Sequence, residues 1–339
     1  MQLGLSDDEQ AIAEAFAGFF TQEAPPAVAR AAEPLGFDAA LWARLRETGA
    51  PGMGVPEDQG GGGATLADLA VVAERLGRAI APVPFVEHAV AARLFGAPDV
   101  LAGDAVATIS LRPASHQGLW RLVPAGAVAD VVVGVDGDEL VAVRSAPPGE
   151  GPRNHACAPI ADRSARAGER EVIGVAAELA RAVDEWKLLT AASLVGIAAA
   201  ALDIGVAYVM SRHQFGVPVG SFQSVQHGLA DLPALIDGSR LLVHKAAWAG
   251  TDVEDAVCDV DDNDISDFGV LASMAFVFAS DTAVRATDRS LHYHGGYGFS
   301  EEFDIQLYYR RARGWALVYD DPSRECLRVA DRLFGPVGD

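Results

Sequence analysis

The sequence predicts a mainly α-helical protein with a small β insertion: an N-terminal helical domain, a short middle β domain and a C-terminal four-helix bundle. Two observations lead to this fold class. Apolar residues recur at helical spacing in residues 6–95 and again after residue 185. In residues 100–175, by contrast, short β-branched runs alternate with Gly, Pro and Asp, which is typical of strands joined by turns. We therefore expect domains over residues 1–97, 98–176 and 177–339.

The N-terminal domain begins with a capping box, in which Ser6 accepts a hydrogen bond from the first helical turn and Glu9 reaches back to Ser6. The helix that follows carries Phe16 and Phe20 on one face, as an amphipathic helix requires. Four consecutive glycines precede a further helix, expected over residues 66–80. No Lys-Ser or Lys-Thr follows these glycines, so they do not match a phosphate-binding P-loop, and we interpret them as a connector.

The middle domain contains several short runs that read as strands. Asp136-Gly137-Asp138 lies between two of them and is typical of a hairpin turn. The pattern therefore predicts a small β domain of short strands. The candidate strands are residues 105–111, 119–126, 129–135 and 139–145.

The C-terminal domain contains long apolar stretches that predict a four-helix bundle. The first stretch, residues 188–210, is nearly long enough to cross a membrane. It is rich in Ala and Gly and carries Asp203, which favours a helix buried inside protein. The expected helices are residues 188–210, 225–249 and 268–290, and residues 304–334 are the segment that completes the bundle.

The charge balance argues against several classes of partner. The formal net charge is -21 and the pI is about 4.6, so the surface repels nucleic acid and anionic membranes. Three widely spaced cysteines form neither a disulfide framework nor a metal motif, which fits a reducing compartment. The N-terminus lacks the basic and apolar regions of a signal peptide. We therefore expect a cytoplasmic protein with no nucleic-acid or membrane partner.

An acidic segment between the second and third bundle helices resembles a calcium loop in its spacing. Asp259, Asp261 and Asn263 would be the first ligands. Asp264 replaces the glycine that such a loop requires, and the glutamate at its twelfth position is missing. Calcium binding is therefore not expected, and the sequence predicts no metal site.

The most informative stretch is residues 208–231, where a long apolar helix gives way to a polar turn and a second helix. Arg212, Gln214 and Phe215 lie at the end of the first helix, and Gln223 lies near the start of the second. A guanidinium group can bind a diphosphate through two parallel hydrogen bonds, and an aromatic face can lie against a ring system. The stretch is therefore a candidate nucleotide-binding corner.

The pattern Arg-x-Gln-Phe-Gly, followed eight residues after the Phe by Gln223 and then by a leucine-rich helix, resembles the acyl-CoA dehydrogenase family. The segment VPEDQGG followed by ERLGRAIAPVP is similar to the N-terminal helical domain of that family. The resemblance covers residues 1–95 and 185–335. It implies an acyl-CoA dehydrogenase-like fold, an acyl-CoA substrate and an FAD cofactor, with Arg212, Gln214, Phe215 and Gln223 contacting an FAD bound to a neighbouring subunit.

A second glycine-rich turn, HYHGGYGF, begins at His292. Glycines allow a backbone to pass close to a ligand. In the acyl-CoA dehydrogenase family a Gln, two residues and Gly-Gly-x-Gly-Phe contact the adenosine side of FAD across a subunit interface. The resemblance therefore assigns Gly295 and Gly296 to cofactor binding, with His292 in place of the Gln and still able to donate a hydrogen bond.

The chemistry of the family needs a carboxylate that removes the α-proton of the thioester, while the β-hydrogen leaves as hydride to the flavin. In many members this base is the Glu of a Tyr-Glu-Gly-Thr motif. Ungapped counting places Tyr319 at that position here, whereas alignment of the tyrosines places Asp320 there. Other members place the base on the helix before the Arg-x-x-Phe-Gly turn, and that position is Trp186, with Glu185 one residue away. Asp320 and Glu185 are therefore the candidate bases.

The middle domain departs from the family as well. It reads SLRPASHQGLW where the family has a Thr-Glu-Pro and a Gly-Ser-Asp element that contact the flavin ring. The chain thus resembles the smaller subunit of actinobacterial α2β2 steroid side-chain acyl-CoA dehydrogenases. That resemblance implies a homologous larger partner that supplies the base, and an external electron acceptor such as an electron-transfer flavoprotein. Two alternatives remain: a self-sufficient homotetramer that uses Asp320 or Glu185, and a structural partner subunit that binds no flavin.

Overall fold

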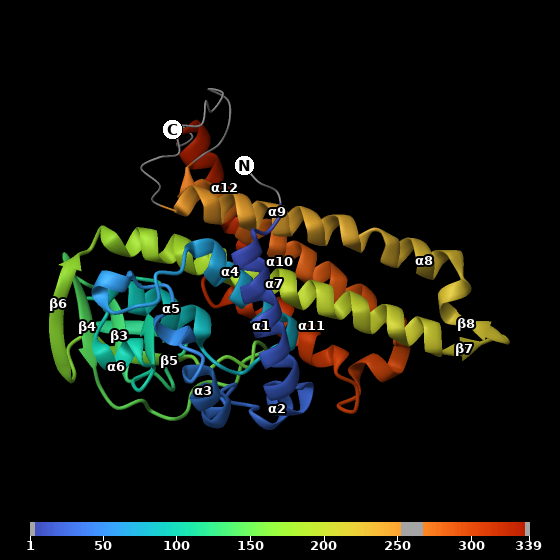
Figure 1. Cartoon of the computed structure of the whole chain (residues 1–339), viewed down its shortest axis with the longest axis horizontal. Helices are drawn as coiled ribbons and strands as arrows, with labels where there is room; N and C mark the ends of the chain where they lie inside the picture. Colours follow the sequence, from blue (N-terminus) through green and yellow to red (C-terminus); the bar gives the residue numbers. More distant parts are fainter. Residues whose placement is uncertain (1–3, 252–266, 336–339) are drawn as a thin grey trace.

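The computed structural model describes residues 4–251 and 267–335, and Figure 1 shows their arrangement. Helices of the N-terminal part lie in front of a bundle of long helices, and a small sheet lies at one end of the bundle. The order of helices, strands and helices along the chain confirms the predicted fold class. Cys258 and the calcium-loop residues Asp259, Asp261, Asn263 and Asp264 lie outside the described residues.

The N-terminal helices begin where the sequence signals predict. The amide of Glu9 donates to Ser6 Oγ at 3.2 Å and the amide of Ser6 donates to Glu9 Oε2 at 2.6 Å, which completes the predicted capping box. Thr65 and Asp68 cap α4 in the same way. The helices are α1 (Asp7–Glu23), α2 (Pro26–Ala31), α3 (Ala39–Arg46), α4 (Leu66–Ala79), α5 (Phe85–Leu94) and α6 (Pro98–Leu101).

The β region forms a four-stranded sheet in the order β1-β3-β4-β6 and a separate pair, β2-β5. β1 is parallel to β3, and the other pairs are antiparallel. β3 and β4 pair from Val131↔Arg144 to Asp136↔Glu139, so the predicted hairpin turn is present. Trp120 is fully buried and donates from Nε1 to the carbonyl of Val135. The strands are β1 (Ala107–Ile109), β2 (Leu119–Val123), β3 (Val131–Asp136), β4 (Glu139–Arg144), β5 (Ala161–Ser164) and β6 (Glu169–Val175).

One of the C-terminal helices differs from the prediction. The expected helix 225–249 is two helices, because Pro233 has no amide hydrogen to continue the ladder. The expected segment 304–334 contains two helices, and the second begins at Pro322. The elements are α7 (Glu178–Ser211), α8 (Gln223–Ala230), α9 (Leu232–Gly250), α10 (Phe268–Tyr293), α11 (Ile305–Leu317) and α12 (Pro322–Phe334).

The central helix α7 packs tightly against α4. A Cβ added at Gly77 would overlap the carbonyl of Ser193, and one at Gly196 would overlap the carbonyl of Glu74, so the two helices cross in close backbone contact. By length and composition α7 and α10 could each cross a membrane, yet 72% and 61% of their most apolar windows are buried inside the protein. α7 therefore serves as a core helix that extends from the sheet to the far end of the bundle (Figure 1).

Candidate functional site

The first candidate region, which we call the corner, lies where α7 ends. Arg212 has extended backbone, and the short strands β7 (His213–Gln214) and β8 (Val217–Pro218) form a hairpin beyond it. The tip of this hairpin holds Phe215 and Gly216, both with positive φ, and the Phe215 side chain is 94% exposed. The hairpin projects from the end of the bundle (Figure 1).

The second glycine-rich turn meets the end of α7. α10 ends at Tyr293, and the 3₁₀ turn Gly295–Phe299 follows. Gly295 has a φ of 61°, and a Cβ at Gly295 or Gly296 would meet no atom within 4 Å, so this backbone is open to an approaching ligand.

An open pocket separates the two segments. Five of the seven predicted cofactor residues line it together, although they come from positions far apart in the sequence. Phe215 and Gln223 do not line it. Phe215 packs against Phe222 with ring centroids 6.3 Å apart, and Gln223 is the first residue of α8. The lining residues are Tyr208, Arg212, Gln214, Val219, His292, Tyr293, His294, Gly295, Gly296 and Tyr297.

The charge of the corner suits an anion. The Arg212 guanidinium lies over the Tyr297 ring, 5.6 Å from its centroid, and makes no ion pair with any residue that the structure describes. Its hydrogen-bond donors are therefore available for a phosphate group. The segments that form the corner also expose large apolar side chains, as surfaces that bind other molecules often do. These side chains are Met210, Phe215, Phe222, Tyr297 and Phe299.

The second candidate region surrounds Trp186 and Tyr319. Trp186 is at one position expected for a base, and Tyr319 is at the other by ungapped counting, with Asp320 as the alternative. Trp186 is 1% exposed, and its ring centroid lies 6.2 Å from that of Tyr319. Phe276 contacts both, with centroid distances of 6.0 Å and 6.4 Å. These three rings therefore pack together as one aromatic cluster.

Glu185, one of the candidate bases, points away from this space. It is 5% exposed, and its carboxylate accepts hydrogen bonds from Arg93 at 2.9 Å and 3.3 Å and from Arg181 at 3.1 Å. It does not line the neighbouring cavity. Glu185 thus joins α7 to α5 in a buried ion pair, and its lone pairs are already in use.

Asp320, the other candidate base, is also engaged. It accepts hydrogen bonds from the amide of Asp321 at 2.8 Å and from Arg328 at 3.0 Å. These two interactions hold the pKa of Asp320 below its ordinary value, which makes it a weaker base. Asp320 does not line the cavity either.

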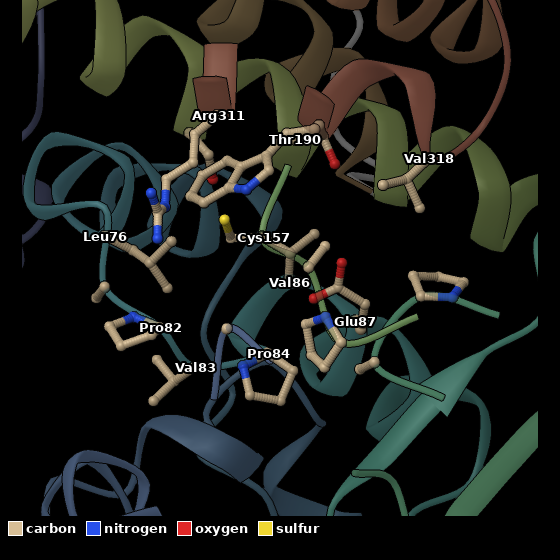
Figure 2. Close-up of a pocket in the computed structure, with 18 of the residues that line it drawn as sticks. Leu76, Pro82, Val83, Pro84, Val86, Glu87, Cys157, Thr190, Arg311 and Val318 are labelled. Atoms are coloured by element: carbon tan, nitrogen blue, oxygen red, sulfur yellow. The ribbon is translucent and has the colours of Figure 1, made fainter. Parts of the chain in front are cut away.

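Next to the aromatic rings lies a small cavity, shown in Figure 2, which is enclosed by α5, α7, α11 and the loop around Cys157. The space that the centre of a water molecule can reach is about 70 Å³. Most of the lining is apolar, with Glu87, Cys157 and Arg311 on different sides of the space. The Arg311 guanidinium is held at the wall by Glu33, at 3.1 Å.

Glu87 is a cavity residue that sequence reasoning missed. Its carboxylate accepts a hydrogen bond from Trp186 Nε1 at 3.3 Å, and burial raises its pKa. The signal in the sequence was a charged residue within PFVEHAV, an otherwise apolar run. The contact itself joins residues 99 positions apart, so no local pattern indicates it.

Comparisons with known proteins identify the family. The model of the acyl-CoA dehydrogenase N-terminal domain matches residues 6–103, and that of the C-terminal domain matches residues 178–318. The acyl-CoA dehydrogenase IpdE2 of Mycolicibacterium smegmatis is 31% identical over 97% of this chain and 100% of its own length. The chain belongs to the acyl-CoA dehydrogenase family. These enzymes are oxidoreductases that act on the CH–CH bond of an acyl-CoA.

Solved structures of the family have the same fold. The Tcur3481–Tcur3483 steroid ACAD G363A variant is 26% identical, with a TM-score of 0.82 over 96% of this chain and 98% of that chain. The ChsE4–ChsE5 complex from Mycobacterium tuberculosis is 22% identical, with a TM-score of 0.82 over 100% of both chains. A glutaryl-CoA dehydrogenase from Mycobacterium smegmatis in complex with FADH2 is 16% identical, with a TM-score of 0.81 over 98% of this chain and 96% of that chain.

Proposed function

We propose that this chain is a subunit of a heteromeric, flavin-dependent acyl-CoA dehydrogenase. It contributes the corner around Arg212 to an FAD at a subunit interface, while a homologous larger subunit supplies the catalytic Glu. The observation that carries the proposal is the contrast between the two regions. The corner leaves cationic and backbone donors open, whereas aromatic rings pack at Trp186 and Tyr319, and the candidate bases Glu185 and Asp320 are engaged in ion pairs.

The residues of the corner fit an FAD that another subunit holds. Arg212 would bind the diphosphate through its free guanidinium donors. The open backbone at Gly295 and Gly296 would let the nucleotide approach, with Gln214 and His292 as hydrogen-bonding partners beside it. Phe215 lies at the tip of the hairpin and Gln223 at the start of α8, both exposed and outside the pocket, where they would contact the partner subunit. When bound, FAD accepts the hydride from the β-carbon of the acyl-CoA.

The proposed assembly is an α2β2 heterotetramer, because an exposed apolar corner needs a neighbour to cover it. The Tcur3481–Tcur3483 and ChsE4–ChsE5 structures support this, since each is named for two components. The word steroid in the first name supports a steroid side-chain thioester as the substrate. We propose an electron-transfer flavoprotein as the electron acceptor and the cytoplasm as the location.

The size of the cavity supports placing the substrate in the partner subunit. About 70 Å³ is far below the roughly 300–1,000 Å³ of a typical ligand pocket. The homotetramer alternative requires Asp320 or Glu185 to act as the base in this chain. The ion pairs of both carboxylates, and their absence from the cavity wall, weigh against that alternative.

The test is flavin content after co-expression with a homologous larger acyl-CoA dehydrogenase subunit from the same organism. We expect a colourless chain alone, a yellow complex, and loss of most of the flavin from the complex that carries Arg212→Ala. Arg285→Ala is the matched control, because Arg285 is an exposed arginine on α10 that pairs with Asp281 and lies outside the corner pocket. A yellow, active chain in the absence of a partner would favour the homotetramer. Full flavin content in the Arg212→Ala complex would favour the structural-subunit alternative.

A further inference from the structure

The pocket at the corner contains a histidine that the family resemblance does not assign. His294 is the first residue after α10 and is 4% exposed. Its ring stacks on that of Tyr208 with centroids 3.9 Å apart and an interplanar angle of 19°. Phe303 packs edge-on against both rings, at 6.0 Å from His294 and 6.2 Å from Tyr208. The imidazole is therefore fixed in orientation on two sides.

One hydrogen bond determines which ring nitrogen carries the hydrogen. Nδ1 of His294 lies 2.7 Å from the carbonyl oxygen of Ser290. A carbonyl oxygen can only accept, so Nδ1 must donate. Burial lowers the pKa of His294, which favours the neutral ring. In the neutral ring with hydrogen on Nδ1, Nε2 carries a lone pair and can only accept a hydrogen bond.

Nε2 is free to meet a ligand. Nε2 has no hydrogen-bond partner among the residues that the structure describes. It is also not one of the unpartnered side-chain atoms that are fully buried, so part of its surface is accessible to solvent. His294 lines the same pocket as Arg212 and Gly295. The residue that carries the free acceptor thus borders the space where the cofactor is proposed to bind.

We propose that Nε2 of His294 accepts a hydrogen bond from a neutral O–H or N–H donor of the bound dinucleotide, either a ribose hydroxyl or the adenine amino group. This inference rests on the proposed function, because it requires a nucleotide in the corner. Arg212 and His294 would thus recognise different parts of the nucleotide. Arg212 offers donors to the phosphate oxygens, which have no hydrogen to give. His294 offers an acceptor to the part of the nucleotide that does.

Two substitutions separate this binding role from a purely structural one. The side-chain amide nitrogen of His294→Asn overlies Nδ1 and keeps the bond to Ser290, but the acceptor at Nε2 is lost. His294→Gln places a carbonyl oxygen near the position of Nε2 but gives up the bond to Ser290. We expect FAD to dissociate about tenfold more readily from the Asn complex, as for one lost neutral hydrogen bond, and nearly as in wild type from the Gln complex.

A structural role predicts the opposite order, with Asn tolerated and Gln impaired, and that order would overturn the proposal. His116→Asn and His116→Gln are the matched controls, since His116 is exposed in the β region. The Arg212→Ala complex keeps the two hypotheses distinguishable. If it loses flavin while the His294→Asn complex does not, only the inference about His294 is wrong. If it retains flavin, the proposed function is wrong.

The ligand can be varied instead of the protein, which avoids any dependence on folding of the variants. The flavin-depleted wild-type complex would be titrated with ADP, 2′-deoxy-ADP, 3′-deoxy-ADP and inosine diphosphate. We expect one of the three analogues to bind about tenfold more weakly than ADP. A deoxy analogue would identify a ribose hydroxyl as the donor, and inosine diphosphate would identify the adenine amino group. Equal affinity for all four ligands would refute the proposal.

Discussion

The C-terminal end of α7 leads into the corner around Arg212, whereas Trp186, nearer its start, closes the cavity beside Glu87. In the corner, the Arg212 guanidinium makes no ion pair within residues 4–251 and 267–335, and the backbone of Gly295 and Gly296 is open. Exposed apolar side chains lie in the same segments. Near Trp186, aromatic rings and ion pairs leave only a small apolar space. The two regions therefore differ both in charge compensation and in packing.

Under the proposed function, this difference would allow one scaffold to serve a reaction in a partner subunit. A region used within the chain needs its polar groups arranged around an enclosed space. A region used across an interface can leave polar groups unpaired, because the partner or its ligand satisfies them on binding. The corner has unpaired polar groups, as expected of a region used across an interface. The region around Trp186 is packed like ordinary protein core. The predictions below test whether the two regions behave independently.

The largest effect is expected from breaking the buried ion cluster of Lys187, Asp184 and Glu325, whose lysine directly follows Trp186 on α7. Lys187 is 2% exposed, and its ammonium group donates to Glu325 at 2.6 Å and to Asp184 at 3.0 Å. Lys187→Met would leave both carboxylates buried without that partner, so we expect the free energy of unfolding to fall by about 3–5 kcal/mol. Urea denaturation of the purified chain measures this.

The double variant Lys187→Met with Glu325→Gln is the control, because it removes one of the stranded charges and should recover part of the loss. A single variant within about 1 kcal/mol of wild type would show that the cluster does not hold α12 in place. Flavin content per folded complex should change far less than in Arg212→Ala, since the corner shares no residue with the cluster. Equal loss of flavin in both variants would break the distinction between the two regions.

Acidification should weaken the packing of α5 against the sheet. His88 is fully buried between them, where Nδ1 accepts from the amide of Ala107 and Nε2 donates to the carbonyl of Val100. Burial lowers the pKa of His88 from 6.5 to about 4. The unfolded chain then binds more protons than the folded chain between these values. The free energy of unfolding should therefore fall by on the order of 3 kcal/mol as the pH falls from about 6.5 to about 4.

His88→Gln isolates this contribution, because glutamine keeps a donor for Val100 and does not titrate. Hydrogen bonds from Arg144 and Arg166 hold the pKa values of Asp99 and Asp136 low. These carboxylates therefore lose their stabilising charge at more acidic pH, and equally in wild type and in His88→Gln. Urea titrations of both proteins between pH 4 and pH 7 should give a steeper slope for wild type. Parallel slopes would show that His88 is not the titrating group.

Much of the fold followed from local signals. The capping box of Ser6 and the β3–β4 hairpin are formed by neighbouring residues, so their sequence pattern determines them. The helix over residues 225–249 was predicted as continuous because apolar periodicity was weighed above Pro233, whose missing amide hydrogen interrupts the ladder. The domain boundaries and the composition of the assembly stay predictions.

Some residues of the candidate site could likewise be predicted from local motifs, whereas others could not. Arg212 and Gln214 belong to one short motif and Gly295 and Gly296 to another, so each motif could be read from the sequence, and the structure adds that they share a pocket. The role inferred for His294 depends on its stacking against Tyr208 from another helix. Glu87 likewise acquires its raised pKa from tertiary burial. Neither environment exists until distant segments pack together, which is why periodicity and spacing could not indicate them.

The smallest effect is expected from substituting Asp320. This substitution tests whether Asp320 acts as a catalytic base. Asp320→Asn keeps the side-chain shape and an acceptor oxygen for the amide of Asp321 while removing the charge that pairs with Arg328. If the base comes from the partner, turnover of the complex with an acyl-CoA should stay within about twofold of wild type. The free energy of unfolding should fall by no more than about 1 kcal/mol, as for a partly exposed ion pair.

A catalytic base behaves differently, because removing a general base typically lowers the rate by about 10²–10⁴-fold. A drop of that size in kcat at unchanged flavin content would show that this chain supplies the base, and it would favour the homotetramer alternative. Glu185→Gln provides a second, matched test, since its carboxylate is more deeply buried and paired with two arginines. It should lower stability more than Asp320→Asn, because two guanidinium groups lose their counter-charge, and still leave turnover unchanged. Retained turnover in both variants, together with lost flavin in Arg212→Ala, is the outcome that only a subunit acting across an interface produces.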